Sequence, residues 1–169
     1  FRSVFQLSSR PMLLVKDDLY SIRPIKRVLV ALDKSDIAKE SLKVAIALTR
    51  DIPDSELIFV HALSNLRSSM DEAINAKPET DPVLAPAIAE AKRYRIDYRC
   101  LAPEGKPGQR ICALADELNV NLLILGSPDR RPSIAKGLPD IDRLLGSSLS
   151  DYVRINAPCP VLLTRIATN

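Results

Sequence analysis

The chain has 169 residues, of which 46% are hydrophobic and 27% are charged, and its formal net charge is +3. This balance fits one globular domain with a short appendage. It argues against a nucleic-acid partner, because the basic residues are mixed with acidic ones. It also argues against a membrane protein, because no apolar run approaches the roughly 20 residues that span a bilayer.

The cysteines and the first residues bear on the cellular setting. Cys100, Cys112 and Cys159 are odd in number and lack metal-ligand spacing, which favours a reduced, cytoplasmic setting. Residues 1–10 have no long apolar core and therefore do not resemble a signal peptide. The sequence opens at Phe1 rather than Met, and we expect it to be a fragment or a processed product.

The first part of the chain predicts a strand, a helix and a second strand. Val28 to Leu32 is a continuous apolar run, which is typical of a parallel strand buried on both faces. The chain then turns over Asp33 to Asp36. Either Ser35 or Asp36 is suited to cap the helix that follows, which ends near Arg50. The second strand is predicted at Leu57 to Val60, with His61 at its end.

The middle of the chain is less regular. Residues 64–81 are polar, and prolines interrupt any long helix there. Four elements are expected beyond this segment: a helix over about 85–94, a strand over 96–101, a loop over 103–108 and an amphipathic helix over 111–118 that ends at Asn119.

The last third carries the most informative pattern. The apolar strand Leu122 to Leu125 stops at Gly126-Ser127, and Gly146-Ser147-Ser148 is predicted to open a short helix. A second apolar strand, Pro158 to Leu163, is predicted to close the chain. A glycine lets backbone come close to a ligand, and the free N–H groups of a helix start attract anions. Together the two places predict a phosphate cradle.

Strands that alternate with helices at this rhythm indicate βαβ units. The fold class is therefore α/β, with a mainly parallel sheet and helices on both faces. In open sheets of this kind, ligands bind beyond the carboxyl ends of the strands, where the strand order reverses. If the reversal lies between the first and fourth strands, Asp33 and Gly126 face one another across the crevice.

One internal repeat is present. Val4 to Lys16 aligns without a gap with Val153 to Arg165 and shares with it a valine, a proline and two leucines. A chance match is the alternative, but we interpret residues 1–16 as the last helix and strand of a preceding copy of the domain. Residues 1–24 would then be a remnant plus linker, and residues 25–169 the complete domain.

The repeat also predicts an extra strand. We expect Pro11 to Lys16 to pair with Val161 to Arg165, because an exposed sheet edge recruits another strand.

Over about Ile25 to Arg165 the chain resembles the universal stress protein (UspA-like) family. Three signatures carry the resemblance: the strand that ends in Asp33-Lys34-Ser35, the strand Phe59-Val60-His61, and the pair Gly126-Ser127 and Gly146-Ser147 followed by Ala157-Pro158-Cys159-Pro160-Val161-Leu162-Leu163. The resemblance implies a five-stranded parallel sheet in an α/β/α sandwich of the adenine nucleotide alpha hydrolase-like, Rossmann-like type. The N-terminal helix-strand stump would be an addition to it.

Members of that family divide into proteins that bind ATP and proteins that do not. The resemblance implies ATP or a related adenine nucleotide as a ligand, accompanied by Mg²⁺. Asp33 would contact the ribose or the adenine, and Ala31 and Ala62 would line the base. The residues implied for the phosphates are Gly126, Ser127, Arg130, Gly146, Ser147 and Ser148.

The sequence departs from the pattern of the binders, Gly-x-x-Gly, nine residues, then Gly-Ser or Gly-Thr. Asp129 replaces the second glycine, and the loop to Gly146 is longer. Unit charges about 4 Å apart repel by roughly 4 kcal/mol at an effective dielectric near 20, so Asp129 opposes a phosphate. Four basic residues in the same loop offset the negative charge of Asp129: Arg130, Arg131, Lys136 and Arg143. Their side chains either clamp a phosphate or are simply solvated.

Two of the implied site residues have structural alternatives. Asp33 can serve only to start the helix that follows it, and Gly146 can be a turn before the capping box Ser148-x-x-Asp151.

Signals for catalysis are weak. His61 is the single histidine, for which packing is the favoured role, and the chain has neither a P-loop nor a nucleophile elbow. We therefore expect a cytoplasmic stress-response protein that binds an adenine nucleotide as a regulatory ligand with little or no catalysis. The alternatives are a nucleotide-free dimerising adaptor and, less favoured, a nucleotide-transfer enzyme. The resemblance implies a partner, a second such domain that contacts the last strand in a homodimer or tandem pair.

Overall fold

The computed structural model describes residues 11–15, 24–61, 77–103, 105–127 and 141–166, and for residues 141–148 it describes the backbone only. Its centre is a six-stranded sheet with the order β1-β6-β5-β2-β3-β4. The strands are β1 (Met12–Leu14), β2 (Arg27–Leu32), β3 (Glu56–His61), β4 (Asp97–Leu101), β5 (Leu122–Gly126) and β6 (Val161–Thr164). Every pairing is parallel except that of β1 with β6.

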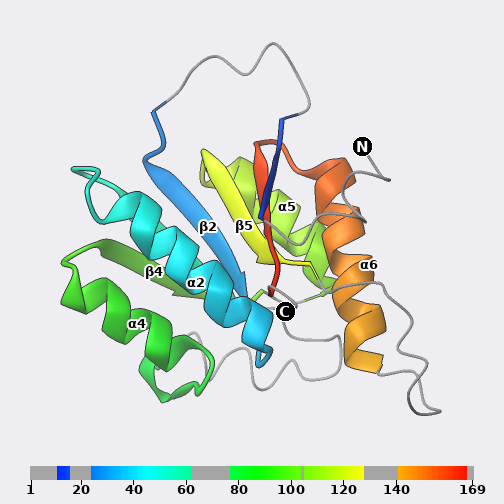
Figure 1. Cartoon of the computed structure of the whole chain (residues 1–169), viewed down its shortest axis with the longest axis horizontal. Coiled ribbons are helices and arrows are strands. Elements are labelled where there is room, and N and C mark those ends of the chain that lie inside the picture. The colour runs from blue at the N-terminus through cyan, green and yellow to red at the C-terminus, as the bar shows by residue number, and fades with distance from the viewer. Residues whose placement is uncertain (1–10, 16–23, 62–76, 104, 128–140, 167–169) are drawn as a thin grey trace.

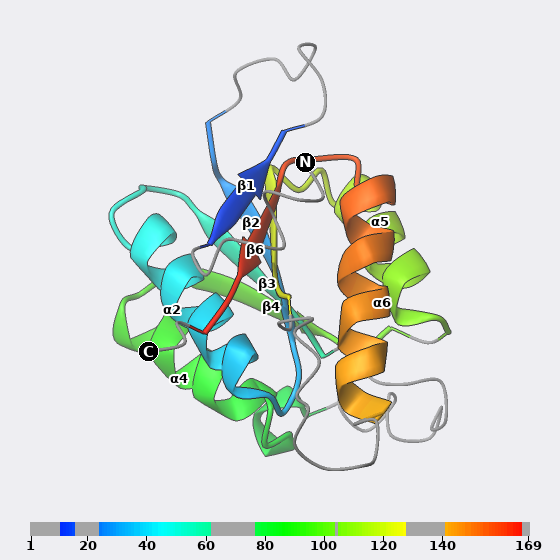
Figure 2. The ribbon, with the colours of Figure 1, turned by 45° about the vertical axis from the view of Figure 1, so that its right-hand side comes forward.

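Helices cover both faces of the sheet (Figures 1 and 2). On one face lie α2 (Asp36–Thr49) and α4 (Leu84–Arg93), and on the other lie α5 (Pro107–Glu117) and α6 (Ile141–Asn156). A short 3-10 turn, η1 (Pro78–Thr80), precedes α4. The predicted α/β sandwich is confirmed, with five parallel strands and one antiparallel edge strand. Among the residues that the structure describes, no helix is long and apolar enough to cross a bilayer.

Alternate residues of β2 belong to two separate hydrophobic cores, one on each face of the sheet. Leu29 and Ala31 pack toward α5 and α6, whereas Val28 and Val30 pack toward α2 and α4. Both faces of β2 are buried, which explains why its sequence is a continuous apolar run and not an alternating one. The sheet is thereby fixed between two helical layers.

Two predicted boundaries were wrong. Helix α5 begins at Pro107 and not at residue 111, because proline is well suited to the first helical position, where its missing N–H is not needed. Helix α6 begins at Ile141 and not at Gly146. The spacing of Ile141, Leu144 and Leu145 continues the apolar period of the helix in the N-terminal direction, and a single glycine does not stop it.

The predicted extra strand is confirmed over its central residues. Met12 to Leu14 pairs with β6 in an antiparallel ladder in which Leu13 lies opposite Leu162. Lys16 and the helix expected before Pro11 lie outside the described residues. Asn119 ends α5 as predicted, with a φ of 50°, the left-handed conformation that asparagine tolerates at this position.

Candidate functional site

The strand order reverses between β2 and β5, as the sequence analysis supposed. From β2 the chain proceeds outward to β3 and β4, whereas β5 and β6 lie on the other side of β2. Val30 lies opposite Ile124, so Asp33 and Gly126 leave neighbouring parallel strands at the same edge of the sheet. We call this the switch-point edge. It is the place where open α/β sheets bind their ligands.

Asp33 lies exposed at the switch-point edge, three residues before the first residue of α2. Its Oδ1 accepts hydrogen bonds from the N–H of Ser35, at 2.7 Å, and from the hydroxyl of Ser35. The Ser35 oxygen in turn accepts the N–H of Ala38 at 3.3 Å and caps the helix. The structural role considered for Asp33 is thus confirmed. An exposed carboxylate remains compatible with a ligand contact, because these bonds involve one of its two oxygens.

Gly126 is needed for the close approach of α2 to β5. A Cβ at this position would overlap the Cγ2 atom of Ile37 and come within 3.0 Å of its Cβ. The absent side chain therefore makes room for the first turn of α2. The next residue, Ser127, is only 3% exposed, and its N–H donates to the carbonyl oxygen of Thr164 at 2.9 Å.

Two buried hydroxyl groups hold α2 against the ends of β5 and β6. The oxygens of Ser41 and Thr164 lie 2.7 Å apart, and both residues are fully buried. One of the two hydroxyls donates to the other, and the second has a backbone acceptor within reach: the carbonyl of Ile37 lies 3.3 Å from the Ser41 oxygen, and that of Leu125 lies 3.5 Å from the Thr164 oxygen. This cluster was missed by the sequence analysis. Its only signal in the sequence was a single polar residue in each of two apolar patterns, Ser41 in that of α2 and Thr164 in that of β6.

Electrostatics disfavour a phosphate at the start of α2. Asp33 precedes the helix and Asp36 lies in its first turn, so two carboxylates already occupy its positive end. A hydrogen bond from Lys39 at 2.9 Å, together with its charge, lowers the pKa of Asp36. A phosphate approaching this end would meet negative charge. At the switch-point edge, the β5 side is therefore more favourable for a phosphate than the start of α2.

The later start of α6 changes the candidate phosphate groups. The first four N–H groups of a helix lack partners inside it, and in α6 these belong to residues 141–144. Gly146, Ser147 and Ser148 lie in the next turn. Ala62, Arg130 and Asp129 lie outside the described residues. The side chain of Ala31 is buried in the core beneath α5 and α6, one residue before the end of β2.

His61 forms a buried pair with Asp81. The Nδ1 atom of His61 lies 2.6 Å from Oδ2 of Asp81, and the other carboxylate oxygen accepts the N–H of Val83 at 2.7 Å. The pair fastens the end of β3 to the start of α4. The predicted structural role of His61 is consistent with this geometry. Asp81 was missed, because no local spacing links it to His61.

No feature of the described residues favours metal or thiol chemistry. No group of three or more potential metal ligands gathers within the described ranges. Burial raises the pKa of the Cys100 thiol to about 11, and the charges of Glu79 and Asp81 act in the same direction. Cys112 and Cys159 are buried. A reactive thiolate is therefore not expected at these positions.

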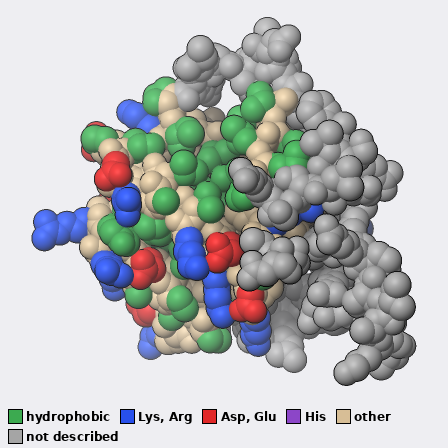
Figure 3. Space-filling model, viewed as in Figure 1, with side chains coloured by type: hydrophobic (Ala, Val, Ile, Leu, Met, Phe, Trp, Pro, Cys, Tyr) green, Lys and Arg blue, Asp and Glu red, His purple; other side chains and the backbone are tan. Residues whose placement is uncertain are grey.

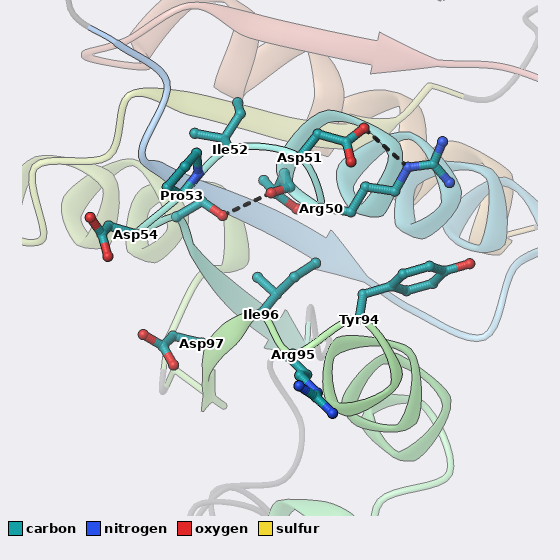
Figure 4. A pocket seen from close by; sticks show the side chains of 11 residues that line it. Arg50, Asp51, Ile52, Pro53, Asp54, Tyr94, Arg95, Ile96 and Asp97 are labelled. Atoms are coloured by element: carbon teal, nitrogen blue, oxygen red, sulfur yellow. Dashed lines mark hydrogen bonds and ion pairs between the residues drawn. The ribbon is translucent and has the colours of Figure 1, made fainter.

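A cavity of about 310 Å³ lies at the opposite edge of the sheet (Figure 4). It is bordered by the loops before β3 and β4, where Arg50 lies 3.5 Å from Asp51. Asp54 and Arg95 adopt left-handed backbone conformations there. This edge carries the amino ends of the strands, and it has mixed charges. The switch-point edge remains the better candidate.

Comparison with known proteins places the fold among relatives. A model of the universal stress protein family matches residues 24–165. The chain is 31% identical to a universal stress protein of Thermus aquaticus, over 83% of this chain and 98% of that protein. It is 26% identical to the universal stress protein YxiE of Bacillus subtilis, over 82% and 98%.

The fold also matches solved structures. A universal stress protein of Archaeoglobus fulgidus has a TM-score of 0.64 and 20% identity, and the match covers 97% of this chain. The chain spans 54% of the length of that structure. Another structure from Archaeoglobus fulgidus, in complex with dAMP, has a TM-score of 0.55 and 23% identity, over 83% of this chain and 97% of that one.

Proposed function

Since the chain belongs to the universal stress protein family, we propose that it is a cytoplasmic stress-response protein that binds an adenine nucleotide as a regulatory ligand, with little or no catalysis. The observation that carries this proposal is the exposed carboxylate of Asp33 at the switch-point edge. Structures of the same fold are described with AMP, cAMP and dAMP bound, which supports an adenine nucleotide as the ligand class.

The proposed pose follows from the charges at the edge. Asp33 accepts a hydrogen bond from the ribose or the adenine, and Ala62 lines the base. The phosphates point away from Asp33 and Asp36, toward the β5 side and the start of α6. ATP, accompanied by Mg²⁺, is the proposed nucleotide, and Arg130 offsets the charge of Asp129.

A nucleotide-free adaptor is the second candidate function. The packing of Ile37 against Gly126 favours it, because that glycine then serves the fold alone. Asp129, which stands where nucleotide-binding members of the family carry a glycine, favours it further. In this function the protein acts only through contacts with other proteins.

The proposed partner is a second domain of the same fold, docked at the last strand as a tandem pair or a homodimer. Two observations support it: β1 resembles β6 in sequence and pairs with it, and the longer Archaeoglobus fulgidus structure matches 97% of this chain over about half of its own length.

Calorimetric titration with ATP and with adenosine tests the nucleotide site. Asp33→Ala should weaken the binding of both ligands at least tenfold, because its contact is to the nucleoside. Asp36→Ala, which removes a carboxylate three residues away, should leave adenosine binding unchanged. Asp129→Gly should tighten binding of ATP but not of adenosine. If Asp33→Ala and Asp36→Ala behave alike, the site is misplaced.

A further inference from the structure

The last strand brings a basic residue to the switch-point edge. Thr164 of β6 lies opposite Gly126 of β5, and its carbonyl oxygen accepts the N–H of Ser127 at 2.9 Å. Arg165 follows Thr164 directly, so it leaves β6 beside the end of β5. This is the side of the edge that is more favourable for a phosphate than the start of α2.

Alternation along β6 directs Arg165 to the face of the sheet that α5 and α6 cover. Leu163 packs in the core beneath these helices, whereas the hydroxyl of Thr164 meets Ser41 of α2 on the other face. Successive side chains of a strand point to opposite faces, so the alternation, continued by one residue, places Arg165 on the face of Leu163. Helix α6 begins at this edge and on this face, because it returns from the carboxyl end of β5 to the amino end of β6 (Figures 1 and 2).

The side chain of Arg165 lies against the protein. The residue is half-buried, and its Nε atom is shielded from solvent. Its backbone is anchored too, because the neighbouring Thr164 is fully buried and bonded to Ser127. A guanidinium that is held in this way loses little side-chain freedom when it binds an anion, and salt screens its charge less than that of an exposed residue. Arg165 is therefore well placed to bind an anion at this edge.

The lysines in the first half of α2 offer no comparable charge. Lys39 lies 2.9 Å from Asp36, and Lys43 lies 2.9 Å from Glu40. Figure 3 shows basic and acidic side chains intermingled over α2. The positive charges of these lysines are thus offset by their neighbours, and because they are exposed, salt screens them further.

The face of α5 and α6 carries further positive charge at the same edge. Lys106 precedes α5, and Arg110 lies in its first turn. Two strand spacings, about 10 Å, separate β2 from β6 across β5. A nucleotide whose nucleoside contacts Asp33 can therefore extend its phosphates over the end of β5 toward Arg165.

We propose that Arg165 binds a phosphate group of the nucleotide, and that the end of the last strand thereby makes the site selective for a nucleotide over its nucleoside. The inference rests on the proposed nucleotide function. It adds a phosphate-binding residue from β6, outside the glycine and serine pattern of the two phosphate segments. The planar guanidinium donates two parallel hydrogen bonds to two phosphate oxygens, which a lysine cannot do. Asp33 then binds the neutral end of the ligand, and Arg165 binds the charged end.

Calorimetric titration of the full chain with ATP and with adenosine tests the inference. Arg165→Ala should weaken ATP binding by about tenfold or more, the loss expected for hydrogen bonds to a charged group, and should leave adenosine binding unchanged. Arg165→Lys keeps the charge without the paired donors and should recover part of the ATP affinity. Lys34→Ala is the matched control, because it removes the same charge from an exposed position beside Asp33, and its ATP affinity should stay close to that of the wild type. Arg165→Gln repeats the test if Arg165→Ala does not fold.

The outcomes separate this inference from the proposed function. If the wild type binds both ligands and Arg165→Ala binds ATP as well as Lys34→Ala does, the role of Arg165 is overturned and the nucleotide site stands. The role is also overturned if the folded Arg165 variants lose adenosine as strongly as ATP, because the residue then supports the fold of the site and not a phosphate. A wild type that binds neither ligand contradicts the proposed function itself, and this inference with it.

Discussion

At the scale of single residues, Gly126 shows how one missing side chain positions the switch-point edge. Its backbone lies against Ile37 in the first turn of α2, and the hydroxyl pair of Ser41 and Thr164 holds the next turn of the helix against β6. The sequence indicated a close backbone approach at Gly126, because a glycine at a strand end is a strong local signal, but a phosphate was the expected neighbour and not Ile37. Its neighbour could not be predicted, since the contact joins segments about 90 residues apart.

Replacing Gly126 by alanine should destabilise the fold by about 1–3 kcal/mol, because the added methyl group overpacks a tight contact. Urea denaturation of Gly126→Ala, Ile37→Ala and the double variant measures this as a cycle. Ile37→Ala should recover much of the loss by restoring space, so the two effects should not be additive. A Gly126→Ala protein as stable as the wild type would show that the contact is loose.

Cys100 provides a second residue-scale prediction. Because burial raises its pKa to about 11, the native thiol should react slowly with iodoacetamide at pH 8, with a rate that rises toward pH 11. In urea the midpoint should fall to about pH 8.5, the ordinary value for a cysteine. Mass spectrometry of the Cys100 peptide after timed alkylation measures both profiles. Equal midpoints in the native and unfolded chains would contradict the effect of burial.

At the scale of elements, the errors of sequence interpretation lie at helix starts. The strands and the helices α2 and α4 were predicted nearly to the residue, because apolar runs and 3.6-residue periods are local properties. Helix α6 was misplaced, since Gly146-Ser147-Ser148 resembles a helix start in any local window. The apolar residues that precede it in the same period outweigh that signal.

Gly146→Ala tests the observed extent of α6. Within a helix, alanine is favoured over glycine by roughly 0.5–1 kcal/mol, so thermal or urea unfolding should show a modest gain in stability. Gly108→Ala in α5 is the matched control. It should lower the stability of the protein, because the new Cβ would lie 2.8 Å from Cδ1 of Tyr152. A loss of stability in Gly146→Ala would indicate that α6 does not continue through this position.

At the scale of the whole molecule, alternation of strands and helices was enough to predict the sandwich. Handedness and short connections then leave few strand orders. The position of the switch point, and with it the edge that carries Asp33, was also correctly supposed. Pairs such as His61 with Asp81 could not be predicted, because they join different elements through a buried hydrogen bond. Site residues on segments beyond the described ranges remain predictions.

Native mass spectrometry of the freshly purified chain tests the central claim most directly. The account predicts a population that carries the mass of one adenine nucleotide, either as purified or after addition of millimolar ATP. Asp33→Ala should lose that population, and Asp36→Ala should keep it. If the wild type shows only the bare chain under both conditions, nucleotide binding at the switch-point edge is contradicted, and the adaptor function stands in its place.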